Sequence, residues 1–120
     1  MKAKNFTAPN ESGIFCGTDN IARIDSRTVA EAFGKQHQDV LEEIENLDCS
    51  AYFRRLNFQL SAYTDNNGKS CPCYTMTREG FTYLISRNNK GEYTQIRKAF
   101  FRRFNEMEAL INDKLKEKYA

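Results

Sequence analysis

The stretch SRTVAEAFGKQHQDVLEEIENL, residues 26–47, holds two short helical patterns on either side of a glycine. In the first pattern Val29 and Phe33 fall on one helical face, and Ser26 is placed to cap the helix start. Gly34 supplies the left-handed backbone conformation that commonly ends a helix. In the second pattern the apolar residues recur at helical spacing: Val40, Leu41, Ile44 and Leu47. Two short helices joined by a tight glycine turn predict a helix-turn-helix.

The segment after this helix pair is predicted to be an antiparallel hairpin. Residues 58–63 alternate apolar and polar side chains in the manner of a strand, and residues 71–76 form the return strand. The run DNNGK at 65–69 is the turn, because Asn and Gly tolerate positive φ. Arg54 and Arg55 are expected in a connector that leads into the first strand.

Two further helices follow the hairpin. Thr77 can cap a short helix whose apolar face includes Phe81 and Leu84. From about 92 to 118 the apolar residues step by three or four: Ile96, Phe100, Phe104, Met107, Ile111 and Leu115. This order of elements predicts an α+β fold, a winged helix-turn-helix-like domain with a β-hairpin and a long C-terminal helix.

Length and composition fit a single globular domain. The chain has 120 residues, of which 40% are hydrophobic and 28% charged, so it is neither disordered nor dominated by apolar sequence. No apolar run approaches the ~18 residues of a membrane-spanning helix, and Lys2 and Lys4 precede no apolar signal segment. We therefore expect no membrane partner and a cytoplasmic location. Residues 1–20 show no sustained period and are expected to form a flexible N-terminal arm.

The sequence gives little support for a metal site, a cofactor or an enzyme activity. The four cysteines are expected as reduced thiols, and Cys71 and Cys73 are separated by one residue, closer than structural zinc sites usually space their ligands. His37 is the only histidine. The chain has no glycine-rich phosphate loop and no nucleophile beside a base. We expect no metal, no cofactor, no catalytic residue and a protein that is not an enzyme.

Three blocks of the sequence resemble the phage regulatory protein family called Rha. They are the helix pair at 26–47, the stretch FQLSAYTDNNGKSCPCYTMTREGFTYLI at 58–85 and IRKAFFRRFNEMEAL at 96–110. The resemblance covers about residues 21–112 as one Rha-like winged helix-turn-helix domain, and leaves the arm 1–20 and the helix end 113–120 outside. It implies a phage or prophage transcriptional regulator in the cytoplasm of a bacterial host that binds duplex DNA through its helix-turn-helix.

Candidate base-reading residues lie on the second helix, opposite Ile44. The amides of Gln38 and Asn46 can each make a paired contact with adenine, and Lys35 can bind a phosphate or a guanine. Gln36 stands at the start of this helix. Solvation alone also explains exposed polar side chains on a helix, so both interpretations stay open.

Further candidate DNA contacts come from cations and amides around the helix pair and hairpin. Asn66 and Asn67 could reach a minor groove if the hairpin acts as a wing, although turn chemistry alone also favours asparagine there. The expected phosphate contacts are Arg27, Arg54, Arg55, Lys69 and Arg78. His37 falls within the apolar arc of its helix, so we expect it to pack rather than to contact DNA.

Charge favours a second hypothesis. Residues 1–60 hold seven Lys and Arg against nine Asp and Glu, whereas residues 61–120 hold eleven against seven. After Lys35 the second helix carries only acidic charges: Asp39, Glu42, Glu43, Glu45 and Asp48. Phosphates repel carboxylates. The alternative is therefore a protein-interaction module, such as an antirepressor or adaptor, whose acidic second helix faces a host or phage regulatory protein.

The C-terminal helix is expected to support a homodimer. A helix of about 27 residues is about 40 Å long, which exceeds the length that a domain of this size readily covers. The apolar stripe continues to Leu115, and Leu110 widens it. We expect the two helix-turn-helix units of a dimer to be held at a fixed separation through this helix.

Overall fold

A computed structural model describes residues 13–86 and 91–119 of the chain. Its strands are β1 (Ile14–Cys16), β2 (Ala22–Asp25), β3 (Phe58–Thr64) and β4 (Ser70–Thr77). Its helices are α1 (Ser26–Phe33), α2 (His37–Glu45), α3 (Ala51–Asn57), α4 (Arg78–Ile85) and α5 (Thr94–Tyr119), with a short 3-10 turn at Gly91–Tyr93. The fold is α+β, as the sequence predicts.

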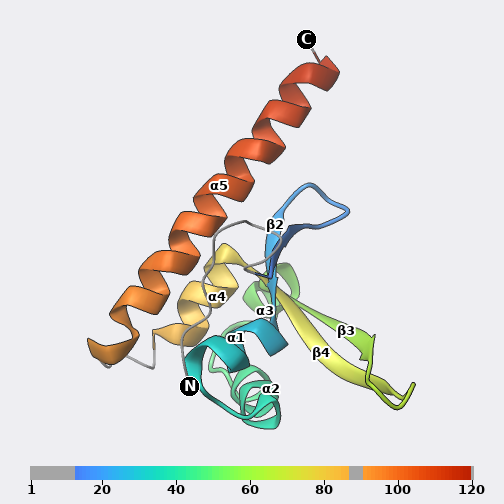
Figure 1. Ribbon diagram of the computed structural model, residues 1–120, viewed down its shortest axis with the longest axis vertical. Helices are drawn as coiled ribbons and strands as arrows, with labels where there is room; N and C mark the ends of the chain where they lie inside the picture. Colours follow the sequence, from blue (N-terminus) through green and yellow to red (C-terminus); the bar gives the residue numbers. More distant parts are fainter. Residues whose placement is uncertain (1–12, 87–90, 120) are drawn as a thin grey trace.

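The four strands form one antiparallel sheet in the order β1-β2-β4-β3. Ile24 of β2 pairs with Met76 of β4, which pairs with Phe58 of β3, so these three side chains share one face. All three are buried. Helices α1, α4 and α5 lie on this side of the sheet, while the β3–β4 hairpin extends away from the body (Figure 1).

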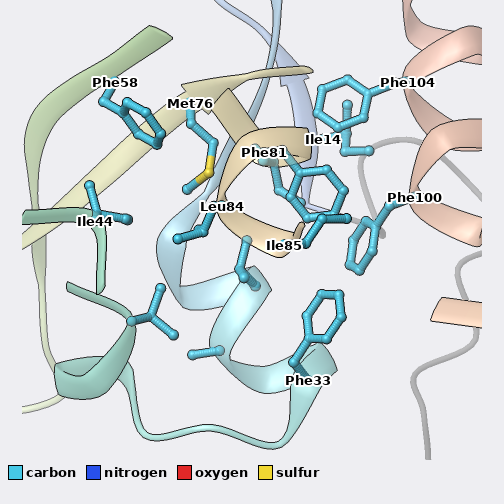
Figure 2. Close-up of a cluster of buried hydrophobic side chains, with 14 of the residues drawn as sticks. Ile14, Phe33, Ile44, Phe58, Met76, Phe81, Leu84, Ile85, Phe100 and Phe104 are labelled. Atoms are coloured by element: carbon cyan, nitrogen blue, oxygen red, sulfur yellow. The ribbon is translucent and has the colours of Figure 1, made fainter. Parts of the chain in front are cut away.

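Aromatic rings fill the centre of the core. Phe81 of α4 lies 5.4 Å from the ring of Phe100 and 5.8 Å from that of Phe104, both on α5. Phe33 of α1 stacks on Phe100 at 6.3 Å. Figure 2 shows these rings converging beside Ile85 and Ile14, with Met76 and Phe58 to the left of them in this view. Burying each ring contributes about 1.5 to 3 kcal/mol, so this cluster helps to hold α5 against α1 and α4.

Most of the predicted elements are present. The helix pair, the hairpin, the helix after Thr77 and the long C-terminal helix all form, and Gly34 ends α1 with a φ of 68°. The cap of α1 differs from the prediction. The Asp25 carboxylate, and not Ser26, accepts the hydrogen bond from the Arg27 N–H at this helix start. Asp25 takes this role because Ser26 is already inside the helix and its side chain is fully buried.

Three elements were not predicted. One is β2, because residues 22–25 are too few to show a period in the sequence. Residues 14–16 form β1 and the Ile14 side chain is fully buried, so ordered structure begins before residue 21. The expectation of a flexible arm over 1–12 lies outside the described residues. Residues 51–57, expected as a connector, form helix α3, which Ser50 caps by accepting the Phe53 N–H. A strand of three residues and a helix of seven are too short to show a period in sequence.

The apolar stripe of α5 is covered more fully than its length predicts. Phe100, Phe104 and Ile111 are buried in the chain's own core, and Leu115 packs against that core half-buried. Leu110 is 53% exposed. The C-terminal end of α5 still projects beyond the rest of the chain (Figure 1). Within the described ranges, no helix is both long and apolar enough to cross a membrane.

Candidate nucleic-acid interface

A buried hydroxyl joins the helix pair to the hairpin. Ser26, at the start of α1, accepts the Tyr74 N–H of β4 at 3.0 Å, and its Oγ lies 2.8 Å from His37 Nε2 at the start of α2. Because one lone pair of Oγ is used by Tyr74, the hydroxyl hydrogen is free to donate to Nε2 of a neutral imidazole. We call Ser26, Arg27, His37 and Tyr63 the junction.

The other two junction residues, Arg27 and Tyr63, connect the junction to the hairpin. The Arg27 guanidinium lies 4.1 Å from the centre of the Tyr63 ring, and the Tyr63 and His37 rings meet edge to face at 6.0 Å. Asp25 holds Arg27 in this position by accepting hydrogen bonds from its Nε at 3.0 Å and its Nη2 at 2.8 Å. The hairpin is therefore fixed beside the first turn of α2.

The junction also sets the charge of the imidazole. Burial of half-buried His37 lowers its pKa, and the Arg27 cation lowers it further, while Asp25 opposes this shift. The neutral form, which can accept from the Ser26 hydroxyl, is thereby favoured. His37 makes the contacts of a packing residue, in agreement with its place in the apolar arc of the sequence.

The tip of the hairpin is shaped by its own hydrogen bonds. Asp65 Oδ1 accepts the N–H groups of Asn67 and Lys69, each at 2.9 Å, and Gly68 adopts a φ of 78°. Asn66, Asn67 and Lys69 are exposed. Their side chains thus stand on a defined turn at the far end of the hairpin (Figure 1).

Comparison with known proteins settles the family. Residues 24–109 match the family described as phage regulatory protein Rha. The chain belongs to the phage regulatory protein Rha family. The match covers the helix pair, the hairpin and most of α5, which are the blocks that carry the resemblance in the sequence.

Relatives of this Rha-family chain come from phages and bacteria. It is 36% identical over 98 residues to an uncharacterized 22.8 kDa protein of Salmonella phage P22, covering 79% of this chain and 48% of that protein. An uncharacterized Haemophilus influenzae protein is 33% identical over 86 residues, 68% of this chain and 49% of that one. A Bacillus subtilis protein named "SPbeta prophage-derived putative antirepressor protein YoqD" is 32% identical over 92 residues, 73% of this chain and 37% of that one.

The chain spans half or less of the length of these relatives. No solved structure matches it.

Besides Arg27, which Asp25 binds, three further cations expected at phosphates are engaged within the Rha-family fold. Lys35 Nζ bonds both carboxylate oxygens of Glu43, at 2.9 and 3.0 Å. Arg54 donates to the carbonyls of Ile44 at 2.7 Å and Leu47 at 2.9 Å, and so closes the C-terminal end of α2.

Arg78 is the third of these cations, and it lies in α4. Its Nη1 donates to Asn105 at 2.6 Å and to Glu108 at 2.9 Å, both on α5. These bonds tie α4 to α5. All three cations therefore stabilise the fold through contacts that cannot be seen in the sequence.

The other expected contacts are divided between different surfaces. Gln36 and Gln38 are exposed at the start of α2, next to the junction. Asn46 caps the opposite end of α2, about 13 Å along the helix axis from its start. Arg55 is exposed on α3 and lines a groove on the sheet. Gln36 and Gln38 flank His37, and Arg27 contacts Tyr63, so these three residues lie near the turn end of the hairpin, where Tyr63 pairs with Cys71.

Acidic residues cover the exposed side of α2 beyond its first turn. Glu42, Glu45 and Asp48 are exposed, and Glu43 is paired with Lys35. Asp39 is exposed near the helix start, where the helix dipole favours a negative charge. A phosphate backbone would therefore meet most of its repulsion beyond the first turn of α2.

Sequence reasoning missed Ser26 and Tyr63 as residues of the junction. Ser26 looks like a helix cap, and Tyr63 looks like one more residue of an alternating strand. Neither residue carries a local signal in the sequence. The partners of Ser26, for example, are His37 and Tyr74, which lie 11 and 48 residues away. In the described part of the chain, no group of His, Cys, Asp and Glu is arranged to hold a metal ion, and all four cysteines are free.

Proposed function

We propose that this Rha-family chain is a phage or prophage transcriptional regulator that binds duplex DNA in the cytoplasm of a bacterial host. The first turn of α2 enters the major groove, and the β3–β4 hairpin acts as a wing on the adjoining backbone. The observation that carries this proposal is the junction, which holds the hairpin rigidly beside the exposed start of α2.

The side chains at the two ends of this surface suit different parts of a duplex. Gln38, exposed on the first turn of α2, has the amide that pairs with the edge of adenine. Lys69 and Asn67 at the hairpin tip suit phosphates and the minor groove. The acidic side of α2 limits groove entry to its first turn, so most of the affinity comes from backbone contacts.

A homodimer through α5 is part of the proposal. Its contact is smaller than the sequence implies, because Phe100, Phe104 and Ile111 are already buried. Exposed Leu110 and the projecting end of α5 are what remains for a second copy. Sedimentation velocity should show a dimer for the wild type and a monomer for Leu110→Glu. A wild-type chain that stays monomeric at tens of micromolar would remove the dimer from the proposal.

DNA binding is tested by fluorescence anisotropy with labelled duplexes at several salt concentrations. Binding should weaken steeply with salt, and Lys69→Gln should lower the salt slope by about 1 and weaken all duplexes alike. Lys98→Gln is the matched control, because Lys98 is exposed near the start of α5, away from the hairpin and from the proposed dimer contact. It should leave the affinity unchanged.

Base reading is tested by the same assay with a set of different duplexes. Gln38→Ala should change the preference among duplexes by about 1 to 3 kcal/mol for each affected base pair. Gln95→Ala, at an exposed position of α5, should change nothing. Absence of binding to any duplex at low salt by the folded chain would refute the proposal, and would direct the search to protein partners of the acidic side of α2.

A further inference from the structure

A polar groove opens on the face of the sheet opposite the core. Ile24 and Met76 face the core, so alternation along β2 and β4 turns their neighbours Arg23, Asp25 and Thr75 to the other side. The groove has a volume of about 670 Å³, in the range of small-molecule sites. Its lining runs from the β1–β2 turn, across the sheet, to the hairpin and α3.

Three arginines from different elements line this groove: Arg23 of β2, Arg27 of α1 and Arg55 of α3. Two carboxylates, Asp19 and Asp25, line it as well, so the five charges leave one net positive charge. Gln59, Ser61 and Thr75 add hydrogen-bonding groups along the sheet. An anion with several oxygens matches this lining better than an apolar ligand does.

The buried Arg23 side chain has more N–H donors than it has acceptors among the described residues. Its side chain is 11% exposed, yet among the described residues it makes one hydrogen bond, from Nη2 to Asp19 at 2.8 Å. Arginine has five N–H donors in a rigid fork, so most of them stay without a protein acceptor. These donors are available to an acceptor that enters the groove.

Arg55 supplies the charge that no carboxylate balances. It is exposed on α3, and within the described part of the chain no hydrogen bond or ion pair engages it. Its neighbour Arg54, in contrast, is held by two carbonyls of the chain. Arg55 is therefore the guanidinium best able to meet an incoming anion.

From these observations we propose that the groove binds a phosphate group through Arg23 and Arg55, with room for the rest of a nucleotide. The site lies on the face of the sheet opposite the core, with Arg27 of α1 in its lining, and does not depend on groove reading by α2. Two sources can supply the phosphate: a free phosphorylated small molecule, or the backbone of a DNA duplex. The same guanidinium chemistry serves both.

Titration of the ¹⁵N-labelled chain with pyrophosphate and with AMP, followed by NMR, tests the site. Signals of groove residues, including the Arg23 and Arg55 Nε–H groups, should shift, whereas adenosine without phosphate should leave them in place. Arg55→Gln should weaken pyrophosphate binding by about fivefold or more, since one charge-assisted pair is lost. Arg102→Gln is the matched control, because Arg102 is exposed on α5 away from the groove, and should leave binding unchanged.

Two results would overturn the inference: no shift with millimolar pyrophosphate at low salt, or equal weakening by Arg55→Gln and Arg102→Gln. Competition between pyrophosphate and a labelled duplex then separates the sources. Displacement of the duplex, together with weaker duplex binding by Arg55→Gln, assigns the phosphate to DNA. Pyrophosphate binding that leaves duplex binding untouched assigns it to a small molecule. Arg55-dependent pyrophosphate binding by a chain that binds no duplex would support this site while refuting the proposed function.

Discussion

Replacing Ser26 with alanine removes the one hydroxyl that joins α1, α2 and β4. Ser26 is fully buried, and its Oγ contacts Tyr74 N at 3.0 Å and His37 Nε2 at 2.8 Å. The variant leaves the Tyr74 N–H without its acceptor and His37 Nε2 without its donor. The cap of α1 is not touched, because Asp25 provides it.

The expected cost follows from these two groups. Leaving a buried polar group unsatisfied costs about 1 to 3 kcal/mol. Tyr74 and His37 are only partly buried, so each falls in the lower part of this range, and together they predict a loss of about 2 to 4 kcal/mol in the free energy of unfolding. For a chain of this size that corresponds to a fall in Tm of roughly 8 to 16 °C. A serine acting only as a helix cap would cost about 1 kcal/mol when replaced by alanine.

Urea unfolding of the wild type, Ser26→Ala, His37→Ala and the double variant measures both the cost and the coupling. The Ser26–His37 coupling energy should be about 0.5 to 1.5 kcal/mol. Ser70→Ala is the control, because Ser70 is exposed in β4 and should change stability by less than about 0.5 kcal/mol. A Ser26→Ala cost below about 1 kcal/mol with no coupling to His37 would refute the junction.

Three further predictions concern pH, the adjacent arginines and the core. The pKa of His37 is lowered in the folded chain, so below its ordinary value of about 6.5 the unfolded state binds more protons, and stability should fall as pH decreases from about 7.5 to 5.5. His37 is the only histidine, so His37→Gln should flatten that decline in urea unfolding, and an unchanged slope would contradict the assignment. Arg54→Ala should cost about 1 to 3 kcal/mol by freeing the carbonyls of Ile44 and Leu47, whereas Arg55→Ala should stay within about 0.5 kcal/mol; equal costs in thermal melting would show that the two are not distinguished. Phe104→Ala should cost about 3 to 5 kcal/mol by emptying a fully buried site, against less than about 1 kcal/mol for Leu110→Ala in the monomer, and comparable Tm values would contradict the packing of α5.

Local patterns were sufficient for the long elements and the family. The helix pair, the hairpin around its asparagine-glycine turn and the long C-terminal helix are each encoded in consecutive residues, so their periods are visible without a structure. The family resemblance rests on the same blocks and is confirmed over residues 24–109. Strands β1 and β2 and helix α3 were missed because they are held by tertiary contacts and are too short for a period to be seen.

What the sequence by itself determined is which stretches are helical or extended and which of their faces are apolar. Only the tertiary structure decided which polar side chains form hydrogen bonds within the chain and which remain available to a ligand. Arg54 and Arg55 are adjacent and identical in sequence, yet one closes the end of α2 and the other faces the groove. Ser26 meets Tyr74 across 48 positions. Periodicity reports on neighbours within one element, whereas the partners of a polar side chain depend on contacts that form only when distant elements pack together.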